Sequence, residues 1–277
     1  MNQKEKLNRI FLILLSLFVV MLGYGILLPI LPYYTERLAL KDNLDTDLIN
    51  FHIGLLTSIY PFFQLLFVVV WGKLSDKYGR KPIILVGLIG FIVMNLLTGL
   101  ATSLPMLYVA RIFGGIFTSS VIPVSNAYLS DITSVKRRTK IMAWSGVAIS
   151  SGLIFGPVIG GFLSQVPIHL EYSIGTLHLD RFSVPFLFAS LLGLIVLFII
   201  SKWLKNTVHI RKFTTNKISL RFSFSKYFIV LLLLSFVMQF IVTLFETVFS
   251  IFGKDELAFN SKQVGIGFML CGSVMAI

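Results

Sequence analysis

Two ionisable residues lie inside long apolar runs, where a charge is costly and therefore suggests chemistry. Arg111 lies shortly after Pro105, and Glu246 is the only acidic residue within any such run. A charged side chain at mid-bilayer costs about 3 kcal/mol and usually faces a cavity or a partner. Because burial favours the neutral form of a carboxyl group, Glu246 is our candidate for binding a proton, with Arg111 as its coupled cation. Each side chain could instead reach surface water, since both lie only about 9 Å from the end of their runs.

The apolar runs predict an all-α membrane protein. Of the 277 residues, 56% are hydrophobic and 13% are charged, and the mean hydropathy is +0.88. This composition excludes an ordinary soluble domain, and runs of about 20 apolar residues can cross a membrane as helices. We expect spans at 10–34, 53–71, 82–101, 106–129, 141–163, 182–204 and 227–252, and an eighth that begins near residue 264 and is too short to cross.

Positive charge is distributed unevenly between the predicted loops. The net charge is +12, and most Lys and Arg residues lie before residue 10 and in segments 72–81, 131–140 and 201–226. Because Lys and Arg collect in cytoplasmic loops, this predicts a cell-membrane protein with a cytoplasmic N-terminus. The excess charge would contact anionic lipid headgroups rather than nucleic acid. A single cysteine, four histidines without ligand spacing and the lack of enzyme motifs predict no metal site, no other cofactor and no enzymatic activity.

A short segment dense in charge, residues 72–81, separates the second and third predicted spans. It resembles motif A of the major facilitator superfamily, the G-x-L-x-D-x-x-G-R-[KR] loop between the same two spans. The matching residues are Gly72, Leu74, Asp76, Gly79, Arg80 and Lys81. The resemblance implies a major facilitator fold, in which Asp131 at the end of the fourth span joins Asp76 and Arg80 in a charge cluster. That cluster would latch the inner side of the outward-open state, and the two glycines would allow a close approach or a sharp turn.

Two further stretches resemble motifs of the same superfamily. The stretch from Arg111 to Gly115 is similar to motif B, R-x-x-x-G, whose arginine is associated with proton coupling. The order G-x-x-x-G-P-x-x-G-G in the fifth span resembles motif C, which is associated with antiporters. Its residues are Gly152, Gly156, Pro157, Gly160 and Gly161. Glycines at every fourth position would form one smooth helix face on which another helix packs closely.

The first and seventh spans resemble one branch of the superfamily. Gly23, Gly25, Pro29 and Pro32 are similar to the first-span signature of its drug:proton antiporters, and the stretch 245–252 resembles NorA-like multidrug exporters. In those exporters a seventh-span glutamate is implicated in proton and cation handling, which implies the same role for the glutamate here. The resemblance implies a proton-coupled exporter of drugs or other small amphipathic molecules that works by alternating access.

Aromatic and amide side chains near these positions are candidates for the substrate cavity. They are Tyr24, Phe62, Gln64, Gln239, Phe240 and Phe245. Aromatic walls with few fixed hydrogen bonds suit the binding of varied substrates. Each of these side chains could equally face lipid or pack against a neighbouring helix.

Two alternatives stay open. Tetracycline-specific exporters share motifs A and C, but they carry an aspartate near the Gly-x-Gly of the first span, which this chain lacks. Since the superfamily has twelve spans, we expect an incomplete chain, and a non-transporting membrane fragment is the second alternative. The expected organisation is an N-terminal six-helix bundle at 1–204, a cytoplasmic linker at 205–226 and the start of a second bundle at 227–277. We expect a monomer whose partners are protons and small molecules, with the proton gradient as its source of energy.

Overall fold

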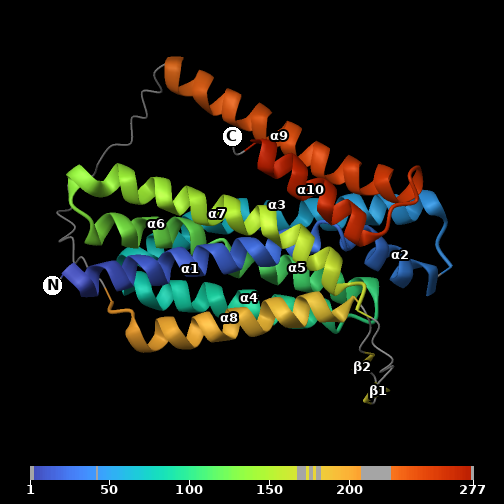
Figure 1. The fold of residues 1–277 in the computed structure, drawn as a ribbon, viewed down its shortest axis with the longest axis horizontal. Coiled ribbons are helices and arrows are strands. Elements are labelled where there is room, and N and C mark those ends of the chain that lie inside the picture. Colours follow the sequence, from blue (N-terminus) through green and yellow to red (C-terminus); the bar gives the residue numbers. More distant parts are fainter. Residues whose placement is uncertain are drawn as a thin grey trace.

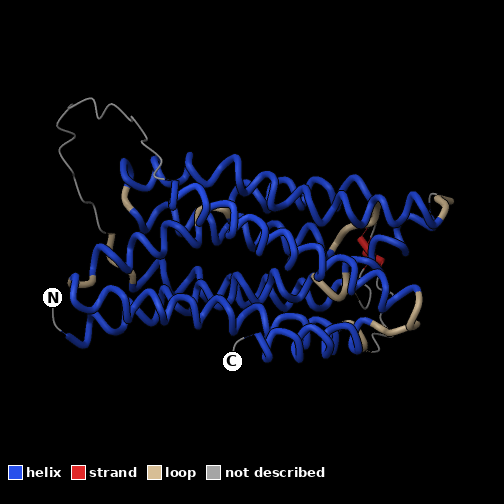
Figure 2. The backbone as a smooth tube through the Cα atoms, turned by 90° about the horizontal axis from the view of Figure 1, so that it is seen from above, coloured by secondary structure: helices blue, strands red, loops and turns tan. Residues whose placement is uncertain are grey.

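Helices make up nearly all of the chain that the computed structural model describes, which is residues 3–41, 43–166, 173–174, 177–178, 182–206 and 226–275. The helices are α1 (Gln3–Leu27), α2 (Leu31–Lys41), α3 (Thr46–Tyr78), α4 (Arg80–Gly99), α5 (Leu104–Thr118), α6 (Val121–Ile132), α7 (Val135–Leu163), α8 (Ser183–Trp203), α9 (Lys226–Asp255) and α10 (Ser261–Met275). Between α7 and α8, the strands β1 (Ser173–Ile174) and β2 (Leu177–His178) pair antiparallel. The long helices lie side by side along one axis, and loops gather at the two ends (Figure 1, Figure 2).

The number of predicted spans agrees with the structure. Within the described residues, seven helical stretches are long and apolar enough to cross a membrane, and one of them comprises α5 and α6 together. The short eighth segment is α10, which has 15 residues and begins at Ser261, slightly earlier than predicted. The predicted linker at 205–226 lies almost entirely outside the described residues, so the division into two bundles stays a prediction.

The first predicted span, 10–34, is wrong as a single helix, because a short turn separates α1 from α2. Proline lacks a backbone N–H, and its ring clashes with the carbonyl four residues earlier. Pro29 and Pro32 therefore interrupt the helical ladder. The carbonyl of Leu28, which Pro32 leaves without its helical donor, accepts a hydrogen bond from the Ser250 hydroxyl of α9 at 3.3 Å.

The fourth predicted span, 106–129, is also broken, between α5 and α6. Pro123 cannot donate the helical hydrogen bond that the carbonyl of Ser119 would accept. The hydroxyls of Ser119 and Ser120 donate to carbonyls three residues earlier, at 2.7 and 2.9 Å, in the last turn of α5. The span is therefore two helices joined at a kink, which has an identifiable cause in the proline.

A seam of glycines joins α7 to α1, the pair of described helices with the most extensive packing. Ideal Cβ atoms at Gly152, Gly156 and Gly160 would lie 2.6, 2.6 and 2.5 Å from carbonyl oxygens of α1. Ordinary van der Waals contact begins near 3.4 Å, so a side chain at any of the three positions would force the helices apart. We call these three residues the glycine seam. They let two backbones approach as small residues do between membrane helices.

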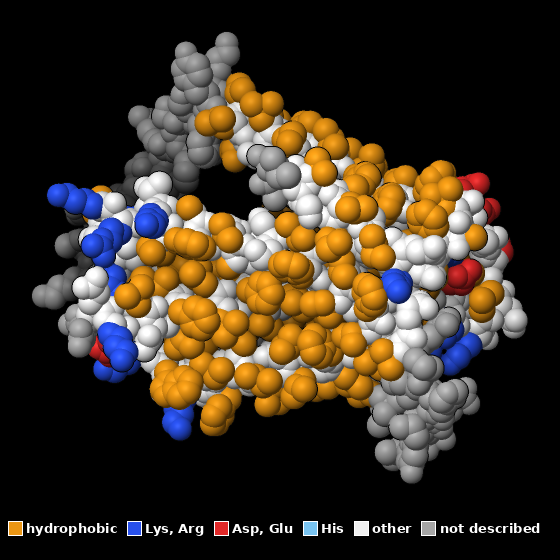
Figure 3. Space-filling model, in the orientation of Figure 1, with side chains coloured by type: hydrophobic (Ala, Val, Ile, Leu, Met, Phe, Trp, Pro, Cys, Tyr) orange, Lys and Arg blue, Asp and Glu red, His pale blue; other side chains and the backbone are white. Residues whose placement is uncertain are grey.

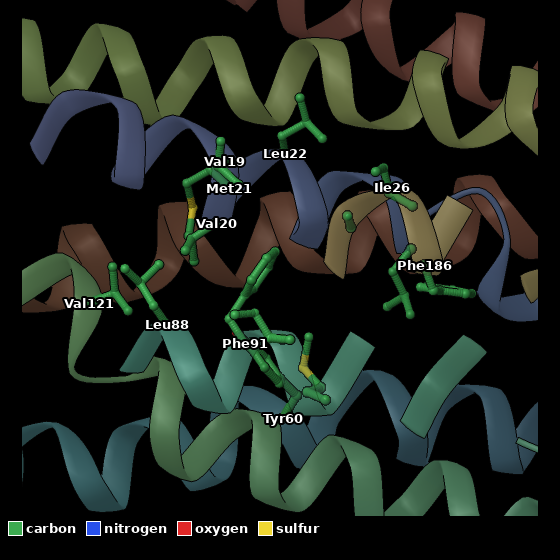
Figure 4. Close-up of a cluster of buried hydrophobic side chains, with 14 of the residues drawn as sticks. Val19, Val20, Met21, Leu22, Ile26, Tyr60, Leu88, Phe91, Val121 and Phe186 are labelled. Carbon is green, nitrogen blue, oxygen red and sulfur yellow. The ribbon is translucent and has the colours of Figure 1, made fainter. Parts of the chain in front are cut away.

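The helices around α1 share one buried apolar core. α1 lies between α7 on one side and α4 and α8 on the other (Figure 1). Figure 4 shows Leu22 and Ile26 of α1 with Phe91 of α4, Phe186 of α8 and Tyr60 of α3 in this region. All five side chains are buried, Ile26 completely. Burial of each large apolar side chain contributes about 1.5–3 kcal/mol relative to an exposed one in water, and in a bilayer the same contacts contribute through close packing.

The last two helices contact the others unevenly. α10 packs along α7, whereas α9 contacts the rest of the molecule through its second half. The side chains of residues 229–241 in α9 are all exposed, and this half of the helix diverges from the bundle (Figure 1). An opening separates it from the remaining helices (Figure 3). Among the described residues, α9 therefore approaches the earlier helices near one end of the molecule and diverges from them toward the other.

Charged side chains mark the two ends of the molecule. On the face shown in Figure 3, Lys and Arg gather at the end that carries the N-terminus and the start of α7, whereas Asp and Glu gather at the opposite end. A band of hydrophobic side chains lies between them. This arrangement has the form expected of a protein whose middle faces hydrocarbon, and the cytoplasmic location of the basic end stays a prediction.

Candidate functional site

Arg111 and Glu246 line the same hollow, although they come from α5 and from the second half of α9. Tyr24 of α1 lines it with them, and the remaining wall comes from α2, α3 and the turn before α2. The hollow has an empty volume of about 360 Å³. The two ionisable residues singled out by their cost in hydrocarbon are therefore brought to one place, from segments far apart in the chain.

Arg111 is buried, with 4% of its surface exposed. Among the described residues, no ion pair includes it, and its Nε has no hydrogen-bond partner. Its guanidinium carbon lies 5.5 Å from the centre of the Tyr60 ring, a cation–π distance. The Tyr60 hydroxyl is in turn 2.6 Å from the Thr118 hydroxyl. An aromatic face thus supports the charge, and at least one buried guanidinium donor, Nε, is unpaired among the described residues.

Glu246 lies in the wall between this hollow and a second, larger one. The second hollow has an empty volume of about 800 Å³, including its open mouth, and is lined by α7, α9 and α10. Phe245 and Phe268 contribute to its wall, and their rings are 6.4 Å apart in an edge-on arrangement. Pro157 of α7 lines the same space. The larger hollow is therefore mainly apolar, with one carboxyl group on its rim.

The structure brings only some of the predicted cavity residues to the hollows. Tyr24 and Phe245 line them, and Gln64 lies one step behind, where its Nε2 donates to the Tyr60 hydroxyl at 3.2 Å. Three others have exposed or half-exposed side chains that line neither hollow: Phe62, Gln239 and Phe240. Their assignment to a substrate cavity stays a prediction.

Sequence reasoning missed Tyr60 and Thr57, which belong to the same region of α3. Thr57 lines the hollow of Arg111, and Tyr60 lies under the guanidinium. A signal was present, because Tyr60 precedes Gln64 by one helical turn and so shares its face. Pro61 does not interrupt this face, because α3 continues through it without a break.

The charged segment between α3 and α4 forms a compact ionic cluster. Nη1 of Arg80 lies 2.7 Å from the Asp76 carboxylate, and its Nε lies 3.2 Å from the carboxylate of Asp131 at the end of α6. Ser75 accepts a further hydrogen bond from Nη1 of Arg80 at 2.5 Å. Arg80 therefore joins three elements, α3, α4 and α6. Whether this cluster latches one state of the protein stays a prediction.

The two glycines of the charged segment have different environments. Gly79 has a φ of +96° and forms the turn that ends α3 and begins α4. A Cβ at this position would also collide with the side chain of Asn206, just past α8. Nζ of Lys81 donates to the carbonyl of Ser201 in α8 at 2.7 Å, so the turn is attached to the end of that helix. Gly72, by contrast, has no atom within 4 Å of an added Cβ, and the close approach expected there is not found among the described residues.

Comparison with known proteins places these features in a family. The sequence profile of the Major Facilitator Superfamily matches residues 13–277. The chain belongs to the Major Facilitator Superfamily. Together with its seven long apolar helices, this makes it a multi-pass membrane protein. The predicted fold class is confirmed.

Relatives in the superfamily include several resistance proteins. Multidrug resistance protein 2 of Bacillus subtilis (strain 168) is 31% identical, over 99% of this chain and 66% of its own length. The class B tetracycline resistance protein of Escherichia coli is 30% identical over 91% and 59%, and the quinolone resistance protein NorA of Staphylococcus aureus is 28% identical over 94% and 62%. The chain thus spans about three fifths to two thirds of the length of these relatives.

Solved structures support the same fold at lower identity. The crystal structure of a human organic anion transporter matches with a TM-score of 0.72 and 22% identity, over all of this chain and 71% of that one. A D-xylose–proton symporter matches with a TM-score of 0.65 and 14% identity, over 96% and 66%. At such identities the likeness establishes the major facilitator fold alone.

Proposed function

We propose that this protein is a proton-coupled transporter that exports drugs or other small amphipathic molecules by alternating access. One observation carries the proposal: Arg111, a buried arginine whose Nε is unpaired among the described residues, lines the same hollow as the membrane-embedded carboxylate of Glu246. An intramembrane charge is costly to keep and marks a pathway for ions or substrate by default. The resemblance of the glycine seam to motif C favours export, and the multidrug and NorA relatives are consistent with it.

Glu246 is the proposed site of proton binding. A proton arriving from outside would neutralise the carboxylate and weaken its attraction to Arg111 or to a bound organic cation. The balance between inward-open and outward-open states would then shift, because each state differs in how well it accommodates the charge. The apolar hollow beside Glu246, with Phe245 and Phe268 in its wall, supplies the surface against which an amphipathic substrate would pack.

Tetracycline-specific export is the second candidate. Its support is the 30% identity to tetracycline resistance proteins of two classes. The missing aspartate near Gly23 and Gly25 weighs against it. A transport assay with tetracycline beside a lipophilic cation separates the two candidates directly.

The proposed location is the cell membrane, with the N-terminus in the cytoplasm. The gathering of Lys and Arg at the end of the molecule that carries the N-terminus supports this orientation. We further propose that the protein acts as a monomer and draws its energy from the proton gradient, without a resident cofactor. Anionic lipid headgroups are the proposed contacts of the basic end.

The test is ethidium efflux from energised cells that express the full chain, with and without a protonophore. We expect protonophore-sensitive efflux that is lost in Glu246→Gln, which keeps the shape of the side chain but cannot ionise. Glu256→Gln removes the same charge from an exposed loop position and should leave efflux unchanged. Efflux that survives in Glu246→Gln would contradict the assignment of the proton site. No export of any cation or of tetracycline would favour a non-transporting membrane protein.

A further inference from the structure

A buried lysine joins α9 to the short helix α2 at the acidic end of the molecule. Nζ of Lys254 lies 3.1 Å from the Glu36 carboxylate of α2 and 3.1 Å from the Asp255 carboxylate. The Lys254 side chain is only 9% exposed, whereas Glu36 and Asp255 are about one-third exposed. A lysine desolvated to this degree is stable only with its carboxylate partners in place. The contact is therefore a largely desolvated ion cluster between helices rather than a solvent-exposed ion pair.

Neutral hydrogen bonds reinforce the same end. The Tyr33 hydroxyl of α2 donates to the carbonyl of Phe259, in the loop after α9, at 2.5 Å. The hydroxyls of Ser164, just past α7, and Ser261 of α10 are 2.7 Å apart and both buried. Because each bond joins α9, α10 or their connecting loop to an earlier part of the chain, the two parts are held together at this end. We call these contacts and the Lys254 cluster the outer clasp.

The opposite end shows no such closure among the described residues. Side chains 229–241 of α9 are exposed, and that half of the helix stands away from the bundle (Figure 1, Figure 3). The larger hollow beside Glu246 is lined by residues of α7, α9 and α10. Among the described residues, the contacts that hold α9 and α10 to the earlier helices are therefore concentrated at the end that carries the outer clasp.

We propose that Lys254, Glu36 and Asp255 form an ionic gate that holds the acidic, outer side shut in the inward-open state. The inference rests on the proposed alternating access, since it assigns the gate of that cycle. Its chemistry predicts an asymmetry between variants. Lys254→Gln removes the shared cation and leaves two carboxylates facing each other, so the outer side opens. Glu36→Gln breaks the same ion pair between α2 and α9. It leaves no pair of facing carboxylates, because Lys254 keeps Asp255, its neighbour in α9, so the effect is smaller.

The experiment measures gate opening by thiol labelling, in the full chain and without reference to transport. Ser261→Cys, in a Cys271→Ser background, places a thiol in the clasp at a position that is 3% exposed. We expect Lys254→Gln to raise its rate of labelling by a membrane-impermeant maleimide added outside by about tenfold, and Glu36→Gln by less than about threefold. Lys254→Arg, which keeps the charge, should stay near the starting rate. Lys41→Gln, which removes a positive charge from an exposed position of α2, is the matched control and should change nothing.

A second reporter separates gate opening from loss of structure. The natural Cys271 lines the larger hollow, so a shift toward the outward-open state should slow its labelling by a membrane-impermeant maleimide added to inside-out membrane vesicles. Opposite changes at the two thiols in Lys254→Gln would support the gate. Equal labelling of Ser261→Cys with and without Lys254, or faster labelling of both thiols, would overturn it. If the gate responds as expected but ethidium and tetracycline are not exported, the proposed function fails while the gate stands.

Discussion

The glycine seam allows one substitution to be worked out in detail, Gly156→Ala. Its added methyl group would lie 2.6 Å from the carbonyl oxygen of Leu22 and 2.8 Å from the Cα of Gly25, both backbone atoms of α1. Neither atom can rotate away as the tip of a side chain can. Since ordinary contact begins near 3.4 Å, α1 and α7 must separate by roughly 0.6–0.8 Å.

The expected cost follows from overpacking, set against helix propensity. Forcing an extra carbon into a tightly packed contact typically costs about 1–3 kcal/mol. Alanine favours a helix over glycine by about 1 kcal/mol, which opposes this cost. Gly146→Ala on the same helix is the matched control, because an added Cβ there has no atom within 4 Å. Gly146→Ala therefore gains the higher helix propensity of alanine without a steric clash. The free energy of unfolding of Gly156→Ala should be about 2 kcal/mol lower than that of Gly146→Ala.

The assay is thermal unfolding of the purified protein in detergent, followed by the fluorescence of its tryptophans. For a chain of this size, about 2 kcal/mol corresponds to a melting temperature roughly 4–8 °C lower in Gly156→Ala than in Gly146→Ala. Gly160→Ala should resemble Gly156→Ala, since its Cβ would lie 2.5 Å from the Ile26 carbonyl oxygen. A melting temperature of Gly156→Ala equal to or above that of Gly146→Ala would refute the close approach of α1 and α7.

Two further predictions concern the charged turn between α3 and α4. Gly79→Ala should lower the free energy of unfolding by about 1–3 kcal/mol, because alanine is strained at the positive φ of this position. Gly72→Ala should not lower it, because there is open space around an added Cβ among the described residues. Thermal unfolding of the two variants measures the difference. A turn that tolerates both equally would contradict the assigned backbone. Asp131→Asn should destabilise the protein by about 0.5–1 kcal/mol and more than Asp76→Asn, because the Asp131 side chain is 21% exposed and Asp76 is 53% exposed. Chemical denaturation of the two variants at low ionic strength measures this difference, and the reverse order would count against Asp131 as the more important partner of Arg80.

Local physical rules explain what could be predicted from the sequence. Apolar runs of sufficient length gave the spans, because lipid leaves the backbone few alternatives to a helix. The free-energy cost of a charge in hydrocarbon was enough to predict Arg111 and Glu246 as functional residues. The sequence did not indicate that both line the same hollow. Glycines at every fourth position of the fifth span likewise predicted a face for close helix packing, although they did not indicate which helix packs there.

Other features depend on contacts that leave no local pattern. The breaks in the first and fourth spans come from prolines, yet Pro61 and Pro157 lie within unbroken helices. A proline alone therefore does not decide whether a membrane helix is broken. At the break in the first span, Ser250 of α9 satisfies the carbonyl of Leu28, a contact that the sequence does not indicate. The ion cluster of Lys254 joins positions far apart in the chain. It could not be predicted, because a lysine near the end of a helix is ordinarily exposed to solvent and unpaired. Only the packed structure distinguishes these cases.

The turn that divides the first span gives its two parts different mechanical roles. The second half of α1 packs against α7 through the glycine seam, whereas α2 contacts α9 through the outer clasp. If the outer end of α9 is displaced, we therefore expect the backbone torsions of the turn to change while α1 stays packed against α7. Leu28 of this turn, and Leu31 and Pro32 at the start of α2, line the hollow of Arg111 and Glu246. Residues at the junction of α1 and α2 thus also form part of the wall of this hollow. A change in the angle between α1 and α2 would therefore change the shape of the hollow.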